Sequence, residues 1–320
     1  MAEAIGAGLR SAGAEADLCP AADGGEGTLE ALLEGLGGEL RSAPAHDPLG
    51  RPIQARFALL GGHGGGSGPS PTAAVEVAQA SGLGRLTAEE RDAEAASSRG
   101  TGELIAAALA AGARRILVAA GGSATTDGGR GAIEAIEAGG GIRTANLEVL
   151  CDTRVPFERA AEVFAAQKGA DARAVRRLSD RLQAIAGTLP RDPRGRAMTG
   201  AAGGLSGGLW AACGARLVPG AAYVLGLLGF DRRLEGATAV ITGEGRLDHQ
   251  SFEGKLVGEV ARRCRGAGVE AHAIVGVLSP DAPSLPRLGV TSVEVAGDPD
   301  SIALAAERIA GGDSGDVALV

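Results

Sequence analysis

Apolar positions along the chain follow two periodicities, one typical of buried strands and one typical of amphipathic helices. Short apolar runs at residues 116–120, 147–151 and 239–241 predict buried strands. The run at 239–241 is followed by a polar, glycine-rich loop and then by apolar residues at helical spacing, which predict a helix over 255–267. This order of strand, loop and helix indicates an α/β protein, in which ligands bind at the carboxyl ends of parallel strands.

The same patterns predict the remaining elements. We expect helices at 2–13, 28–36, 101–111, 131–138, 157–166, 171–185, 209–213 and 301–310. Strands are expected at 16–19, 73–79, 272–277 and 292–295, and a strand pair over 39–60 with a turn at 47–52. Thr28 and Asp171 are the predicted helix caps. Residues 61–71 are expected to form a surface loop and 311–320 to be disordered.

Length and composition restrict the class of protein. A chain of 320 residues is long for one core, so we expect two domains. The net charge of −8 argues against a nucleic-acid partner, because phosphate binding needs a basic face. The longest mostly apolar run, 104–113, is too short to span a bilayer. Four scattered cysteines without a metal-ligand spacing indicate reduced thiols and a cytoplasmic location.

Three glycine-rich loops carry acidic residues and are the candidates for chemistry. The sequence D-G-G-x-G occurs at 23–27 and again at 127–131, directly after the run 121–126. The third loop covers 242–255 and supplies Glu244, Asp248 and Lys255. Glycines allow the backbone to approach a ligand closely, and the carboxylates and the lysine suit a metal ion and a phosphate, as phosphoryl transfer requires. The alternative is that Asp and Gly simply form turns here.

Two familiar motifs are rejected. Gly254-Lys255 is followed by Leu256 and lacks the earlier glycine of a P-loop. Gly204-Leu205-Ser206-Gly207-Gly208 matches the nucleophile elbow of serine hydrolases, but no apolar strand precedes it. A glycine-rich loop before a helix is the better interpretation of this segment.

Five ordered motifs together resemble the class I glycerate kinases. They are Pro20-Ala21-Ala22-Asp23-Gly24-Gly25-Glu26-Gly27-Thr28, Gly121-Gly122-Ser123-Ala124-Thr125-Thr126-Asp127-Gly128-Gly129, Gln167-Lys168-Gly169-Ala170, Gly200-Ala201-Ala202-Gly203-Gly204-Leu205, and Thr242-Gly243-Glu244-Gly245-Arg246-Leu247-Asp248 with Gln250-Ser251 and Gly254-Lys255. The resemblance runs from the first residues to beyond residue 280.

The resemblance implies a fold of two α/β domains. One is flavodoxin-like, with a Rossmann-like parallel sheet, and is expected to comprise residues 1–40 and 238–320. The other is inserted into it and is expected to comprise 41–237. Family members usually begin with a strand and an Asp-x-Phe-Lys-Gly segment ahead of the first helix. The sequence begins at that helix, so we expect the N-terminal strand to be missing.

The resemblance also implies an activity, namely ATP-dependent phosphorylation of D-glycerate with 2-phosphoglycerate favoured over 3-phosphoglycerate as the product. ATP and Mg²⁺ are the expected cofactors, and they and glycerate are expected to meet between the domains. The oligomeric state is left open, with a homodimer among the candidates. Two alternatives are a kinase of another small hydroxy acid and a truncated, non-catalytic nucleotide or sugar-acid binder. A serine hydrolase is a distant third.

The expected site residues fall into three groups. Catalytic roles are predicted for Asp23, Asp127, Asp248 and Lys255. Substrate or phosphate binding is predicted for Glu26, Gly121, Gly122, Ser123, Arg246 and Lys168. Metal binding is predicted for Glu244 and Asp248. Oxygen ligands suit Mg²⁺, backbone N–H groups of a glycine turn suit a phosphate, and a guanidinium suits a carboxylate or phosphate.

Overall fold

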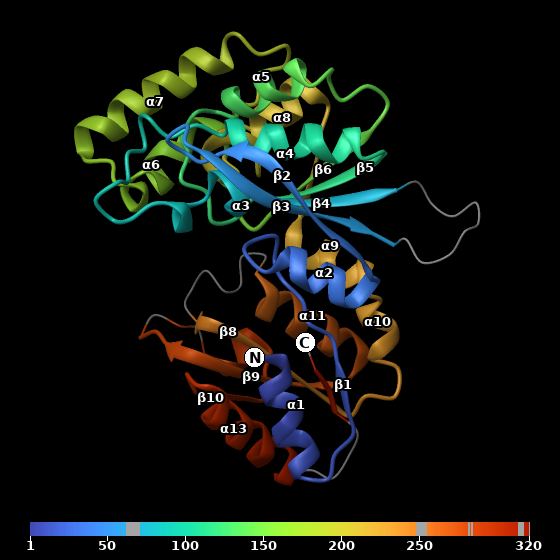
Figure 1. The fold of residues 1–320 in the computed structure, drawn as a ribbon. Helices are drawn as coiled ribbons and strands as arrows, with labels where there is room; N and C mark the ends of the chain where they lie inside the picture. Colours follow the sequence, from blue (N-terminus) through green and yellow to red (C-terminus); the bar gives the residue numbers. More distant parts are fainter. Residues whose placement is uncertain (62–70, 248–254, 281, 283, 313–316, 320) are drawn as a thin grey trace. The chain divides into compact units, whose positions relative to one another are not determined.

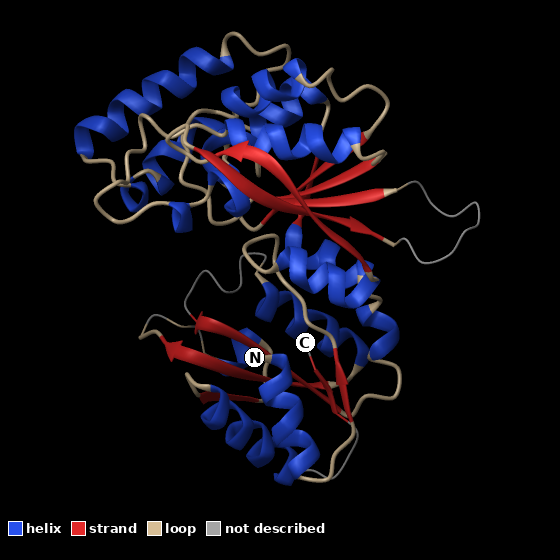
Figure 2. Ribbon diagram, viewed as in Figure 1, coloured by secondary structure: helices blue, strands red, loops and turns tan. Residues whose placement is uncertain are grey.

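The computed structural model describes the chain except for residues 62–70, 248–254, 281, 283, 313–316 and 320. Contacts divide the chain into two compact units (Figure 1). The first unit comprises Met1–Asp23 and Ala221–Val320, and the second comprises Gly24–Gly220. Each unit has its own sheet and contains both strands and helices (Figure 2). The α/β class and the presence of two α/β parts agree with the prediction.

The first unit is built on a five-stranded sheet whose neighbouring strands are all parallel. Its strand order is β1 (Ala16–Leu18), β11 (Val317–Leu319), β8 (Ala239–Leu247), β9 (Glu270–Leu278) and β10 (Ser292–Val295). Its helices are α1 (Ala2–Ser11), α9 (Gly220–Leu227), α10 (Phe230–Arg233), α11 (Leu256–Ala267), α12 (Leu285–Leu288) and α13 (Pro299–Gly312). Helices α1 and α13 pack side by side and bury Ile5, Leu9 and Ile302 against the sheet (Figure 1).

The second unit is built on a mixed six-stranded sheet. Its strands, in spatial order, are β2 (Gly38–His46), β3 (Pro52–Leu60), β4 (Thr72–Glu76), β5 (Arg115–Ala119), β6 (Asn146–Cys151) and β7 (Arg216–Pro219). The first three strands are antiparallel to one another, and β4 to β7 are parallel. Its helices are α2 (Thr28–Leu36), α3 (Ala78–Ser81), α4 (Arg99–Ala110), α5 (Arg130–Ala138), α6 (Ala160–Phe164), α7 (Ala172–Ala186) and α8 (Leu205–Cys213).

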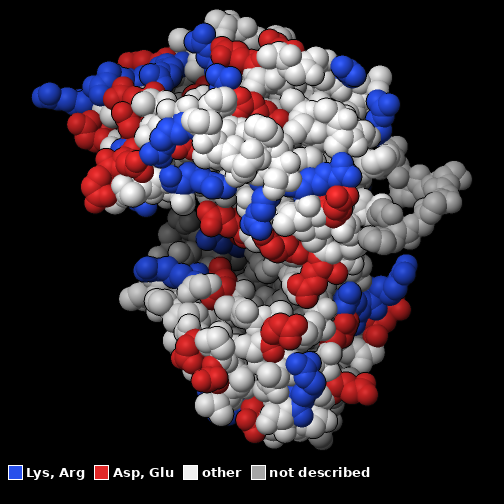
Figure 3. All heavy atoms as spheres, viewed as in Figure 1, with Lys and Arg blue, Asp and Glu red and all other residues white. Residues whose placement is uncertain are grey.

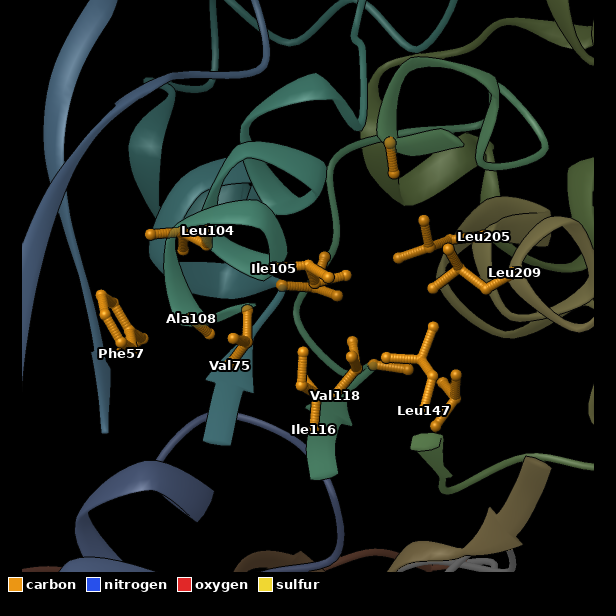
Figure 4. Close-up of a cluster of buried hydrophobic side chains, with 14 of the residues drawn as sticks. Phe57, Val75, Leu104, Ile105, Ala108, Ile116, Val118, Leu147, Leu205 and Leu209 are labelled. Carbon is orange, nitrogen blue, oxygen red and sulfur yellow. The ribbon is translucent and has the colours of Figure 1, made fainter. Parts of the chain in front are cut away.

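Aliphatic side chains form the main core of the second unit (Figure 4). Val75, Val118 and Val149 form one row across β4, β5 and β6, and all three are fully buried. Leu104 of α4 and Leu205 of α8 belong to the same buried cluster. Full burial of such a side chain contributes roughly 1.5–3 kcal/mol to the free energy of unfolding. Aliphatic side chains therefore stabilise this core in a sequence with few aromatic residues.

Several predicted elements have different limits in the structure. Strand β8 continues to Leu247, because it pairs with the long strand β9 along its length. The paired residues of β8 are Ala239 to Glu244, Arg246 and Leu247. The predicted loop at 242–247 is therefore strand. The prediction of disorder at the C-terminus is wrong for Val317–Leu319, which form β11 between β1 and β8. The predicted surface loop at 61–71 lies mainly outside the described residues.

The limits of the two units follow from where α2 packs. This helix packs against β2, β3 and β4. Residues from Gly24 onward therefore belong with the second sheet. The sequence predicts that this domain begins at residue 41. The second unit ends at Gly220, whereas the predicted end of this domain is residue 237.

The surface carries charges of both signs. On the face drawn in Figure 3, acidic and basic side chains are interspersed over both units. Among the helices that the structure describes, none is long and apolar enough to cross a membrane.

Candidate functional site

The carboxyl ends of the parallel strands in the second unit are where a ligand site is expected. Strand β5 ends at Ala119 and leads into the glycine run 121–126, and β6 ends at Cys151 and leads into Asp152. The peptide N–H of Ala120 donates to the carbonyl of Leu150, so the two loops leave the sheet side by side. The sequence thus places a glycine turn and an aspartate at neighbouring strand ends.

The two glycine-rich segments predicted to be functional contact each other within this unit. The N–H of Gly121 donates to the carbonyl of Gly24 at 3.0 Å. A Cβ atom at Gly121 would lie 2.4 Å from the Cα of Gly25, so no larger residue fits there. A Cβ at Gly122, whose φ is +71°, would lie 2.6 Å from Oε1 of Glu26. The structure therefore brings Glu26 to the glycine turn, as a shared site requires.

A small cavity of about 100 Å³ opens at this turn. Its polar lining comes from the turn, from the segment after β6 and from the short helical turn Ala166–Lys168, and comprises Gly121, Gly122, Ser123, Asp152, Thr153, Gln167 and Lys168. This volume is that of a small cavity, which admits a few water molecules or a small ligand group. It suits a carboxylate or a phosphoryl group, and it is smaller than the roughly 300–1,000 Å³ of pockets that enclose larger ligands.

Lys168 is the buried cation of this cavity. Its side chain is 2% exposed, and its Nζ donates to Ser123 Oγ at 3.0 Å and to the carbonyl oxygen of Thr125 at 2.6 Å. Burial lowers the pKa of Lys168 to about 7, and the negative charge of Asp127 opposes that shift. Lys168 is thus a buried basic group whose two hydrogen-bond partners are neutral, which makes the cavity a candidate site for an anion.

Asp127 holds the second D-G-G turn together. Its Oδ2 accepts from the N–H and the Oγ of Ser98, both at 2.8 Å, and from the N–H of Gly131 at 3.3 Å. Its Oδ1 accepts from the N–H of Gly129 at 3.1 Å. These bonds fix the start of α5 to the start of α4. The turn-forming interpretation therefore accounts for the hydrogen bonds of Asp127, and its predicted catalytic role stays a prediction.

The Gly200 to Leu205 motif supports the cavity from the other side. Ala202, Gly203 and Gly204 adopt left-handed φ values of 52°, 64° and 91° in succession. Ala202 lines the cavity, and Gly203 lies against the carbonyl of Thr125 that accepts from Lys168. A non-glycine residue at positive φ is uncommon and is enriched at ligand sites. This motif thus positions the acceptor of the buried lysine.

Ser206 is not a nucleophile of the hydrolase type. Its hydroxyl is fully buried and donates to the carbonyls of Met198 at 2.6 Å and Ala201 at 3.2 Å. The turn before α8 is a short 3₁₀ segment at Ala201–Gly204, not a strand. The geometry of a nucleophile elbow is therefore absent from this described segment, in agreement with its rejection from the sequence.

The predicted residues of the first unit lie along β8 and at the start of α11. Glu244 pairs with Val275 in the ladder and is half-buried, and Arg246 is exposed and reaches Ser279 Oγ at 3.5 Å. Lys255 occupies the N-cap position of α11. Asp248 lies outside the described residues. Asp23 is the last residue of this unit's first segment and is half-buried.

The described residues contain no group of three His, Cys, Asp or Glu side chains able to hold a metal ion. This does not conflict with Mg²⁺ in a phosphotransferase, because Mg²⁺ is commonly held by one or two carboxylates together with substrate phosphates and water. Glu244 is a carboxylate of that kind in the second half of the parallel strand β8. The donor chemistry therefore fits Mg²⁺.

Sequence reasoning missed two parts of the cavity as candidate site residues. Thr125 contributes a backbone carbonyl, and no side-chain pattern announces such a role. Asp152 lines the cavity, and its position directly after a predicted strand was the available signal. Both are placed by the parallel pairing of β5 with β6.

Parallel strands with a glycine turn and a buried lysine at their carboxyl ends define an α/β protein with a candidate anion site. Comparisons with known proteins specify the class further. The sequence profile of the Glycerate kinase family matches residues 1–140 and 137–309. Glycerate kinase from Bacillus subtilis is 35% identical over 91% of this chain and 84% of its own length. Glycerate 2-kinase from Escherichia coli is 34% identical over 92% of this chain and 85% of its own length.

A solved structure gives the same result for the fold. A crystal structure named as a glycerate kinase 2 from Salmonella typhimurium LT2 superposes with a TM-score of 0.78. It is 31% identical, and the match covers 97% of this chain and 92% of that chain. The chain belongs to the glycerate kinase family, which is a family of phosphotransferases.

Proposed function

We propose that this protein transfers the γ-phosphoryl group of ATP to D-glycerate and forms 2-phosphoglycerate. Family membership supports the reaction type, and the name of the Escherichia coli relative supports the 2-hydroxyl as acceptor. The observation that carries the proposal is the small cavity with Lys168 at its base and the glycine turn Gly121–Ser123 at its rim. Its size admits an anionic group of glycerate dimensions, and its cation matches that charge.

The residues of the second unit have separate tasks in this proposal. Lys168 binds an anionic oxygen of the substrate carboxylate or of the transferred phosphoryl group, and Ser123 orients the ammonium. Gly121 and Gly122 allow the glycine turn to pack against the Gly24–Glu26 segment, because side chains there would meet Gly25 and Glu26. Phosphoryl transfer depends mainly on such positioning and charge neutralisation.

The residues of the first unit provide the remaining proposed roles. Glu244 and Asp248 hold Mg²⁺, which neutralises the phosphate oxygens when it is bound. Arg246 and Lys255 bind phosphate or carboxylate oxygens. Asp23 or Asp127 orients the attacking hydroxyl or accepts its proton. The hydroxyl oxygen forms a bond to the γ-phosphorus as the bond to the β–γ bridging oxygen breaks, and ADP leaves.

The test is ADP release from ATP and Mg²⁺ with D-glycerate, followed by product detection with enolase. Enolase acts directly on 2-phosphoglycerate, whereas 3-phosphoglycerate first needs a mutase. We expect the Lys168→Met variant to lose roughly 10²-fold or more in kcat/KM, as for removal of one preorganised charge-stabilising donor. Arg159→Met removes an exposed cation of the same unit and should have no effect.

Two outcomes would contradict the proposal. If D-glycerate gives no ADP release and another small hydroxy acid does, the substrate is different. If Lys168→Met retains the activity of the parent protein, the cavity is not the substrate site. The panel of small hydroxy acids therefore tests the substrate, and the Lys168→Met variant tests the site.

A further inference from the structure

The choice of basic residue at the buried cavity is unusual for this chain. The sequence contains 31 lysines and arginines, and all of them except Lys168 and Lys255 are arginines. Lys168 is 2% exposed, whereas Lys255 is half-buried at a helix end. The two residue types differ in one decisive property, since an arginine stays charged in a protein and a buried lysine can release its proton.

The hydrogen bonds of Lys168 leave its charge uncompensated. Its two partners, Ser123 Oγ and the carbonyl oxygen of Thr125, are neutral. A protonated ammonium has three N–H donors, so one donor remains for a ligand. Burial of a charge without a partner is costly, and the usual response is loss of the proton.

Among the residues that the structure describes, Asp127 acts on Lys168 by its charge and Asp152 lines the same cavity. Asp127 favours the ammonium by its charge, but its carboxylate already accepts four hydrogen bonds from Ser98, Gly129 and Gly131. Asp152 lies on the cavity wall that β6 provides. The other described lining residues, including Leu83, Gly121, Gly122, Ser123 and Ala202, have no titratable side chain.

We propose that Lys168 is largely neutral in the empty cavity at slightly alkaline pH and takes up one proton when a carboxylate or phosphoryl oxygen binds beside it. The anion then accepts the third N–H bond and provides the missing counter-charge. A lysine serves this purpose, and an arginine does not, because an arginine would remain a buried cation without a partner when the cavity is empty. This inference deepens the proposed function, on which its choice of ligand rests.

The size of the effect follows from the pKa of about 7 in the empty cavity. If the bound anion restores the pKa to about 10, binding takes up about 0.5 proton at pH 7 and about 0.9 proton at pH 8. The apparent affinity for the anion then falls about 5-fold from pH 7 to pH 8 and about 50-fold from pH 7 to pH 9. Ligand binding and protonation are thus linked.

The presence of just two lysines permits a direct measurement on the whole protein. Incorporation of [¹³Cε]lysine gives two side-chain resonances, and the Lys255→Arg variant identifies the one from Lys168. The resonance is followed from pH 5.5 to 10 in the free protein, with D-glycerate alone, and with inorganic phosphate alone. The two ligands distinguish a carboxylate from a phosphoryl group as the natural occupant.

We expect a midpoint near pH 7 in the free protein and a midpoint at least 2 pH units higher with one of the ligands. A midpoint near pH 10 in the free protein would overturn the inference. A midpoint near 7 that neither saturating ligand moves would overturn it as well. These results do not depend on turnover, so a linked shift without ADP release would contradict the proposed function alone.

Two variants test the linkage through binding. Lys168→Arg keeps a fixed positive charge, so its affinity for the same ligand should lose the decline between pH 7 and pH 9. Lys168→Met has no charge and should bind weakly at every pH. Calorimetry of the parent protein in buffers of different ionisation enthalpy should show proton uptake at pH 8, and equal heats in all buffers would contradict the linkage.

Discussion

Gly203 shows how one missing side chain supports the cavity. Its φ is +64°, and a Cβ atom there would lie 1.9 Å from the carbonyl oxygen of Thr125. That oxygen accepts the shorter hydrogen bond of Lys168, at 2.6 Å. The glycine therefore sets the position of the backbone that holds the buried lysine.

We expect Gly203→Ala to destabilise the protein and to weaken substrate binding together. Left-handed strain costs about 1 kcal/mol, and the displaced Thr125 carbonyl adds a further cost of about 1–3 kcal/mol from its lost hydrogen bond. Urea unfolding and KM for D-glycerate measure the two effects. Gly195→Ala is the matched control, because Gly195 has a φ of +68° and open space around its Cβ position. Equal losses in both variants would contradict a role for close packing at Gly203.

Single residues were predictable where local chemistry determines them. Asp171 caps α7 as predicted, with its carboxylate accepting from the N–H groups of Arg173 and Ala174. The prediction for Thr28 is wrong, because Gly27 occupies the N-cap position of α2 and the Thr28 hydroxyl donates to the carbonyl of Gly25. A contact that is distant in sequence, such as Lys168 with Thr125, leaves no local pattern to read.

At the scale of elements, a buried carboxylate of β4 anchors helix α2. Glu76 is 3% exposed, and its Oε1 accepts from the N–H of Leu29 in the first turn of the helix at 2.8 Å. Because α2 directly follows the Gly24–Gly27 turn, this bond fixes the segment that contacts Gly121. Burial raises the pKa of Glu76, although the hydrogen bond from Leu29 acts in the opposite direction.

The raised pKa of Glu76 predicts a specific pH dependence of stability. Between the unfolded value of 4.5 and the higher folded value, the folded state binds more protons, so the free energy of unfolding falls as pH rises. Glu76→Gln keeps an oxygen acceptor for Leu29 and removes the charge. We expect its stability relative to the parent protein to increase from pH 4.5 towards neutral pH, as measured by urea unfolding. Glu30→Gln, an exposed neighbour, is the control, and a pH-independent difference for Glu76→Gln would contradict the prediction.

Element types were easier to predict than element limits. The helix over 28–36, the pair β2 and β3, and β10 follow from apolar spacing and turn residues. The extension of β8 and the strand β11 do not, because both depend on pairing with strands distant in sequence. Glycines within β8 resemble a loop in isolation and become strand only beside β9.

At the scale of the whole molecule, the chain crosses between the two units at two places. The first unit is formed from both ends of the sequence, and β11 pairs with β1 and β8. The second unit is one continuous segment with its own sheet and core. The sequence indicated two α/β parts, but it did not show which sheet α2 packs on. The amphipathic pattern of a helix shows that one of its faces is buried, but it does not show which sheet covers that face.

This organisation predicts that the segment Gly24–Gly220 folds by itself. Its core closes around Val118 and Leu104 within the segment, and the cavity with Lys168 is lined entirely by its residues. We expect the isolated segment to unfold cooperatively in urea and to give a dispersed amide NMR spectrum. Its single lysine resonance should titrate near pH 7, as in the whole chain. Because the first unit supplies the other proposed groups, the segment should release no ADP with D-glycerate. A collapsed spectrum, or a lysine midpoint near pH 10 in a folded segment, would show that the cavity depends on the first unit.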